Sequence, residues 1–253
     1  MIIVSLLILS IVAIVLLTAR FNMHPFLALL FAALGFALLS GMPLNLIVDS
    51  INNGFGTTLG KIGMVIVLGV IIGAFLEQSG GAYKLADVVL KIIGRHRVHE
   101  AMAIIGYIVA IPVFADSGFI ILSSLNKSLT KKAGLSIAGT GIALILGLML
   151  THVMVPPTPG PIAAAGILNA DVGLVMLLGL IVSALGLVVA IVYAKMVSAS
   201  IYIDPNPELS EVEIEEKIKS APNTFKSLLP IVVPILLIVG KSIVDLNYEK
   251  ESS

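Results

Sequence analysis

Residues 151–161 read THVMVPPTPGP and interrupt an otherwise apolar stretch of the chain. Four prolines within six residues cannot continue a helix, because each lacks an amide hydrogen and clashes with the preceding turn. Unpaired backbone groups cost several kcal/mol in lipid, so such a break survives at membrane depth only where protein or a water-filled cavity surrounds it. The stretch therefore predicts a broken helix that lines a binding site. The alternative is an ordinary turn outside the membrane.

The composition of the chain is that of an integral membrane protein. Hydrophobic residues make up 58% of the 253 residues, charged residues make up 12%, and the mean hydropathy is +1.11. Soluble domains carry about 25% charged residues, which this chain cannot match. The apolar runs approach the length of about 20 residues that crosses a bilayer, and they lie at 2–19, 25–39, 62–76, 135–150 and 172–194. We expect a multi-pass, all-helical protein of a bacterial inner membrane.

Composition also excludes several classes of function. The net charge is zero, which gives no indication of nucleic-acid binding. The chain has no cysteine, which excludes disulfides, thiolate metal sites and cysteine nucleophiles. We expect no metal and no cofactor.

The organisation of the chain follows from the apolar runs. Residues 2–19 lack the basic start and the short apolar core of a signal peptide, so we interpret them as the first span. Residues 44–60 form a mixed, glycine-bearing segment, and residues 82–94 have the spacing of an amphipathic helix at the membrane surface. We expect four parts: a membrane domain at 1–200, a cytoplasmic polar loop at 201–224 with a short helix around 211–219, an additional transmembrane helix at 225–245 and a polar tail at 246–253.

A second interrupted segment lies at residues 101–125, where PVFADSGF occupies residues 112–119. The interruption leaves two apolar pieces of roughly ten residues, which are too short to cross a bilayer separately. Basic residues flank the segment at 95–100 and at 127–132, and lysine and arginine accumulate on the cytoplasmic side of membranes. We predict a re-entrant hairpin that enters and leaves from the cytoplasm, with a solvated basic loop before it and the amino terminus of the chain outside.

The residues best placed for chemistry lie in these two interruptions. A carboxylate inside an apolar segment is costly, so Asp116 is predicted to handle substrate or a proton. The alternative is that Asp116 only caps the amino terminus of the second half-helix. Ser117 and Gly118 would then offer a hydroxyl and a backbone amide at that helix end. His152 is a second proton candidate, because imidazole titrates near neutral pH, or else an ordinary hydrogen-bonding partner.

An intramembrane aspartyl protease is the enzymatic alternative to these interpretations. That chemistry needs two carboxylates in one site, whereas only Asp116 lies deep in an apolar run. We therefore predict that the protein is not an enzyme. We interpret His96 and His99 as solvated residues of the basic loop.

Four short stretches together resemble one known family. They are GFGTTLGKIG at 54–63, LEQSGGA at 76–82, PVFADSGF at 112–119 and HVMVPPTPGP at 152–161. They are similar to the amino-terminal half of the gluconate permease family of proton symporters, and the resemblance runs from about residue 1 to residue 245. That family resembles a wider group of ion transporters built from two inverted repeats. Each repeat carries a re-entrant hairpin and a broken helix, which together enclose an anion.

The resemblance implies a fold and a site. The fold is an all-α integral membrane fold of about seven transmembrane helices plus one re-entrant helical hairpin and one proline-broken helix, which form one of two inverted repeats. The function is import of gluconate or a similar sugar acid with protons by alternating access, with the carboxylate held by half-helix amides and hydroxyls. The implied substrate-binding residues are Asp116, Ser117, Gly118, Thr151, Thr158 and Gly160, and the implied proton-coupling residues are Asp116 and His152.

The sequence shows no second hairpin motif. We therefore expect this chain to act with a second-repeat chain or another copy of itself, within the lipid bilayer, and not to transport alone as a monomer. One alternative is a truncated membrane fragment that does not transport. Another is a transporter of a different organic anion, such as glycerate or citrate.

Overall fold

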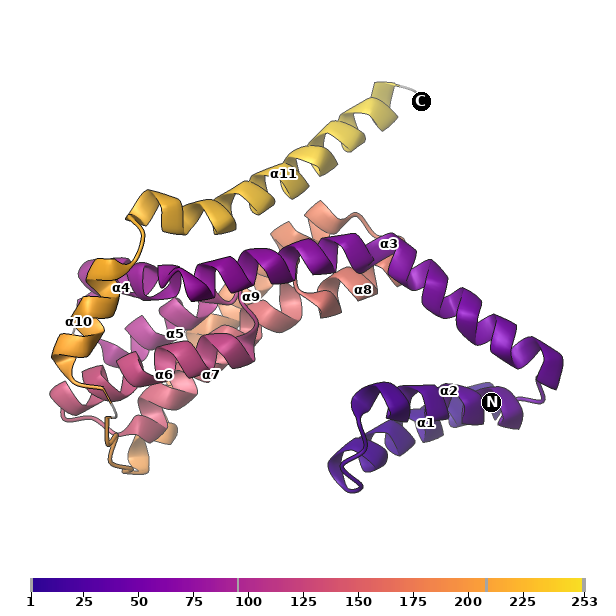
Figure 1. The fold of residues 1–253 in the computed structure, drawn as a ribbon, viewed down its shortest axis with the longest axis horizontal. Coiled ribbons are helices and arrows are strands. Elements are labelled where there is room, and N and C mark those ends of the chain that lie inside the picture. The colour runs from indigo at the N-terminus through magenta and orange to yellow at the C-terminus, as the bar shows by residue number, and fades with distance from the viewer. Residues whose placement is uncertain (1, 95, 208, 252–253) are drawn as a thin grey trace. The chain divides into compact units, whose positions relative to one another are not determined.

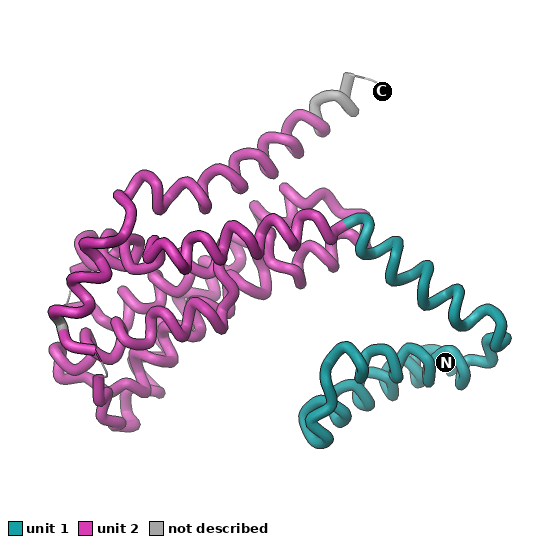
Figure 2. Tube along the Cα trace, viewed as in Figure 1, with its two compact units in different colours: residues 1–61 teal, residues 62–253 magenta. Residues whose placement is uncertain are grey.

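The computed structural model describes residues 2–94, 96–207 and 209–251, and every regular element among them is helical. The chain divides into two compact units, residues 1–61 and residues 62–253 (Figure 2). The side chains of Glu211 and of residues 246–253 lie outside the description, as does Arg95, which contributed to the basic flank of the predicted hairpin.

The first unit contains α1 (Ile2–Ala19), α2 (Pro25–Leu39) and the beginning of α3 (Leu44–Gln78). Pro25 is the first residue of α2, a position where a backbone amide makes no hydrogen bond within the helix, so its lack of an amide hydrogen costs nothing. The mixed, glycine-bearing segment at 44–60 is the first part of a continuous helix of 35 residues. Each glycine lowers the stability of the helix by about 1 kcal/mol relative to alanine, which weakens a helix without breaking it. No proline, which would break it, lies within α3.

The second unit continues from residue 62 of α3 through eight further α-helices and a short 3₁₀ turn (Figure 1). These elements are α4 (Gly81–Ile93), α5 (Val98–Val109), α6 (Ala115–Lys132), α7 (Ile137–Met154), α8 (Pro159–Leu168), α9 (Val172–Met196), η1 (Ser198–Ser200), α10 (Glu211–Ser220) and α11 (Thr224–Glu251).

The core of this unit lies where α5 meets α7. Met102 and Ile105 of α5 are fully enclosed, as are Leu144 and Leu148 of α7. The two backbones approach closely at Gly106, where an added Cβ would lie 2.5 Å from the carbonyl oxygen of Leu144. Small residues permit such an approach between membrane helices, where lipid supplies no hydrophobic force to drive helices together.

Helices α5 and α6 form a helix–turn–helix, and its re-entrance into the membrane stays a prediction. Thr151 of α7 donates a 2.8 Å hydrogen bond to the carbonyl of Tyr107, near the end of α5, so α5 and α7 run in the same direction. The hydroxyls of Thr130 and Thr140 lie 2.7 Å apart, which places the end of α6 at the beginning of α7. Helix α6 therefore returns to the level at which α5 began. The side of the membrane on which both ends lie stays a prediction.

Five helical stretches of the described chain are long and apolar enough to cross a membrane. They are Ile2–Ala19, Leu44–Gln78, Ile137–Leu168, Val172–Ser200 and Thr224–Asp245. Helix α2 is shorter, with 15 residues. The protein is a multi-pass, all-helical membrane protein, and the predicted number of about seven spans is not confirmed.

Three other expectations need correction. The basic loop predicted at 95–100 is shorter, because α5 begins at Val98 and buries His99 against α7. The amphipathic helix at 82–94 exists as α4, but it packs into the core with only one side free, since Leu85 and Leu90 are buried. The tail at 246–253 continues α11 as far as Glu251 rather than leaving the helix at residue 245.

Candidate functional site

The break between α7 and α8 is shorter than predicted. Helix α7 continues to Met154, and α8 begins at Pro159. The intervening residues 155–158 contain a cis peptide bond between Pro156 and Pro157. Thr158 is the N-cap of α8, and the prolines that follow sit in the first turn, where no amide hydrogen is needed. The sequence therefore produces a second helix start within one apolar stretch.

The tip of the hairpin lies between Val109, the last residue of α5, and Ala115, the first residue of α6. Pro112 prevents a regular helix here, and Phe114 occupies the N-cap position of α6 in an extended conformation. Both interruptions therefore end in a helix amino terminus, α6 after the hairpin tip and α8 after the break.

Helix α3 packs against both interruptions through two glycines one turn apart. An added Cβ on Gly73 would clash with the carbonyl oxygen of Pro112, and one on Gly69 would lie 3.4 Å from the carbonyl oxygen of Pro157. The spacing of these glycines is that of a small-xxx-small helix contact. Helix α3 thus brings the hairpin tip and the helix break to one place.

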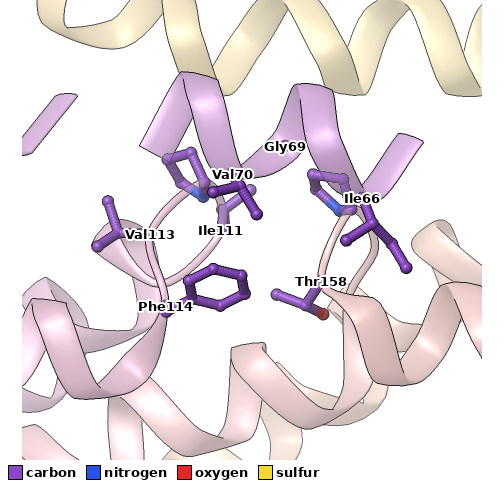
Figure 3. A pocket seen from close by; sticks show the side chains of 9 residues that line it. Ile66, Gly69, Val70, Ile111, Val113, Phe114 and Thr158 are labelled. Atoms are coloured by element: carbon purple, nitrogen blue, oxygen red, sulfur yellow. The ribbon is translucent and has the colours of Figure 1, made fainter. Parts of the chain in front are cut away.

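A small cavity of about 10 Å³ lies at this meeting point. Figure 3 shows Phe114 and Thr158, one from each interruption, across from Ile66, Gly69 and Val70 of α3. The volume is close to the lower limit for a single water molecule, which is about 10–15 Å³. A sugar acid therefore does not fit the site in the conformation described.

Asp116 is the second residue of α6 and is exposed. The alternative role of Asp116 as the N-cap does not hold, because the cap position belongs to Phe114 and no side chain accepts a hydrogen bond there. Gly118 does not offer a free amide either, since its N–H donates to the carbonyl of Phe114 at 2.8 Å. It is buried against Leu148 instead. Ser117 is half-buried and lies in the first turn of α6, where backbone amides have no carbonyl acceptor within the helix.

The two predicted threonines are buried and have backbone partners. Thr151 donates to the carbonyl of Tyr107, and Thr158 donates to the carbonyl of Val155 at 2.7 Å. Each hydroxyl oxygen keeps lone pairs but has already used its hydrogen. Gly160 is exposed, and no described atom lies within 4 Å of the position of its missing Cβ.

His152 links the two interruptions through its ring. The imidazole lies edge-on to the ring of Phe114, with 5.7 Å between the ring centroids. Its Nδ1 atom is buried and has no hydrogen-bond partner among the described residues. A buried polar atom without a partner is costly, so this nitrogen is a position where a ligand or a water would be stabilised.

The structure therefore brings His152 and Thr158 together at the hairpin tip, whereas Asp116 and Gly160 face outward and Thr151 serves to connect α7 to α5. Sequence reasoning missed the two glycines of α3. The signal that would have found them is the GVIIG spacing at 69–73. No group of three or more potential metal ligands occurs in the part of the chain that the structure describes.

The chain matches the family described as GntP family permease over residues 1–253. An uncharacterized permease of Haemophilus influenzae is 41% identical over 95% of this chain and 51% of the relative. A gluconate permease of Pseudomonas aeruginosa is 36% identical over 94% of this chain and 54% of the relative. A D-serine transporter of Escherichia coli is 35% identical over 99% of this chain and 56% of the relative.

The chain spans about half the length of the curated relatives it matches, and its correspondence to their amino-terminal half stays a prediction. No solved structure matches it. The family and the relatives are permeases and not enzymes, which agrees with the multi-pass helical fold. The chain belongs to the GntP family of permeases.

Proposed function

We propose that this chain forms one wall of the substrate site in a transporter that imports gluconate or a similar sugar acid together with protons. The observation that carries the proposal is the meeting of two helix amino termini. Helices α6 and α8 both begin beside the same small cavity, after Phe114 and at Thr158. A helix amino terminus carries roughly half a positive charge, so two of them favour an anion between them. Helix α6 adds the amides of its first turn, whereas Pro159 and Pro161 leave α8 to act mainly through its dipole.

The names of the relatives support a carboxylate as the common recognised group. They include gluconate permeases, a transporter of D-serine and a transporter of L-idonate. Gluconate, idonate and serine differ in length and in their other substituents, but each carries a carboxylate and a hydroxyl group. We infer that the helix amino termini bind the carboxylate and that other surfaces select the remainder of the molecule.

The closed cavity requires movement or a second surface to admit such a substrate. Its volume of about 10 Å³ is far below the roughly 300 Å³ at which small-molecule sites begin. Alternating access in transporters built from repeats moves one repeat against the other around a shared site. We propose that a second-repeat segment or another copy of the chain completes the site.

A threonine substitution tests this assignment. Thr158→Val removes the hydroxyl at the start of α8, whose hydrogen is held by the carbonyl of Val155 and whose oxygen can still accept from a hydroxyl group of gluconate. We expect gluconate binding to weaken by about fivefold, because a hydrogen bond between neutral groups is worth about 1 kcal/mol. Binding is measured by titration of the complete transporter in detergent. Thr130→Val is the matched control, since Thr130 is also buried but bonds to Thr140 away from the hairpin tip. Equal gluconate affinity in both variants and the wild type would remove Thr158 from the site.

A further inference from the structure

Helices α4 and α10 are neighbours in the second unit (Figure 1). A polar pocket lies between them and shares no residue with the site at the hairpin tip. Its volume is about 410 Å³, within the range of roughly 300–1,000 Å³ typical of small-molecule sites. Its charged and polar lining comes from α4, α10 and the residue before α11: Lys84, Asp87, Lys91, Glu215, Lys219 and Asn223.

The pocket is built by packing. A capping box between Ser210 and Glu213 starts α10. Ile214 then buries its side chain, with 5% of its surface exposed, and Lys217 places its ammonium 5.3 Å from the centre of the Tyr83 ring of α4. The hydroxyl of Tyr83 in turn donates to the carbonyl of Ile121 in α6. Helix α10 is thus held on α4 by an apolar contact and a cation–π contact, and the wall of the pocket has a defined position.

The lining carries more positive than negative charge. Asp87 is almost buried and accepts from two lysines, Lys91 at 2.8 Å and Lys84 at 3.5 Å. Glu215 pairs with Lys219 at 3.8 Å, where both side chains are more than half exposed. Three lysines against two carboxylates leave one positive charge in excess. An exposed pair at that distance contributes little, so the ammonium of Lys219 can change partners at small cost.

Asn223 adds neutral donors to the same wall. Its side-chain oxygen accepts from the amide of Lys226 at 2.9 Å and so caps the start of α11. This bond uses the carbonyl end of the amide and leaves both hydrogens of the NH₂ group for another acceptor. The pocket therefore presents ammonium groups, an amide NH₂ and a nearby helix amino terminus to one volume.

We propose that this pocket binds a phosphate group, carried either by the headgroup of an anionic lipid or by a soluble phosphate. A phosphate presents several acceptor oxygens on one centre, which suits donors that arrive from three elements. A lysine binds phosphate as a point charge and needs no planar partner, unlike arginine. The same helix α4 also exposes an apolar side chain, because Ile92 is 79% exposed.

Two opposite substitutions on α10 test the proposal without disturbing the buried Asp87. Lys219→Gln is expected to weaken binding by about tenfold, the usual effect of losing a charge-assisted hydrogen bond. Glu215→Gln removes the competing carboxylate and is expected to strengthen binding by about threefold, a gain that a damaged fold would not produce. Lys131→Gln is the control, since Lys131 is an exposed lysine paired with Asp204 outside the pocket.

The probes are a soluble short-chain phosphatidylglycerol and inorganic phosphate, each titrated separately into the complete protein in detergent. Saturable binding of phosphatidylglycerol alone, with the expected order of variants, identifies a lipid headgroup site. The same order with inorganic phosphate identifies a soluble ligand. No saturable binding of either probe, or affinities that change equally in the control and the two pocket variants, would overturn the proposal.

Discussion

Thr151 and Thr158 illustrate what sequence reasoning at the scale of residues can and cannot supply. The resemblance to the permease family implies both as substrate ligands at the proline-rich break. The structure buries both and gives each hydroxyl to a backbone carbonyl. A break leaves carbonyls without helical donors, and nearby hydroxyls satisfy them. The sequence locates polar residues at the break, but the partner of Thr151 is Tyr107, 44 positions away, which no local pattern reveals.

His152 provides the prediction that belongs at this scale. We expect His152→Gln to keep gluconate exchange across vesicles and to lose its acceleration by an inward proton gradient, because glutamine retains hydrogen bonding but does not titrate. Uptake of labelled gluconate by the reconstituted complete transporter, with and without the gradient, measures the difference. Asp116→Asn is the comparison. Loss of acceleration in Asp116→Asn together with normal acceleration in His152→Gln would assign the proton to the carboxylate instead.

At the scale of elements, the glycines of α3 show what the sequence does not predict, namely which of them contact another backbone. The glycines at 54, 56 and 60 belong to the mixed segment for which the sequence predicts no span, yet they lie within α3, where no described atom lies within 4 Å of their missing Cβ positions. Gly69 and Gly73 lie inside a predicted span, and the sequence predicts no role for them, yet both interruptions pack against them. Glycine only weakens a helix, so its role depends on which backbone packs against it, and this is a tertiary property.

A graded series of alanine substitutions along α3 tests this view. Gly73→Ala is expected to destabilise the protein by about 1–3 kcal/mol and to impair transport, because the new methyl group would overlap the carbonyl of Pro112. Gly69→Ala is expected to have a smaller effect, since its nearest neighbour lies at contact distance. Gly56→Ala meets open space, so it is expected to raise stability by up to about 1 kcal/mol and to leave transport unchanged. Thermal unfolding in detergent and uptake into vesicles would show the order, and a Gly56→Ala as damaging as Gly73→Ala would contradict it.

At the scale of the whole molecule, the hairpin was predictable and its packing was not. The sequence predicts a hairpin because a proline and an acidic residue interrupt an apolar stretch and basic residues lie on both of its flanks. The way α5 runs alongside α7 depends on Gly106, whose approach to Leu144 cannot be read from either segment alone. The ion pair of Lys195 with Glu100 and that of Lys131 with Asp204 involve the segments at the open end of the hairpin, which agrees with a polar boundary there.

Cysteine labelling decides on which side of the membrane this boundary lies. The chain has no cysteine, so single substitutions report individually. We expect Arg97→Cys and Ser128→Cys to react from the cytoplasmic side, because α6 returns to the level at which α5 begins. Ala170→Cys, which follows the 32-residue stretch of α7 and α8, should react only from the opposite side. Intact cells and inverted vesicles, treated with a maleimide that does not cross membranes, separate the two faces.

Labelling of Arg97→Cys and Ser128→Cys from opposite faces would mean that the segment crosses the membrane. The two helix amino termini would then no longer share a site as proposed.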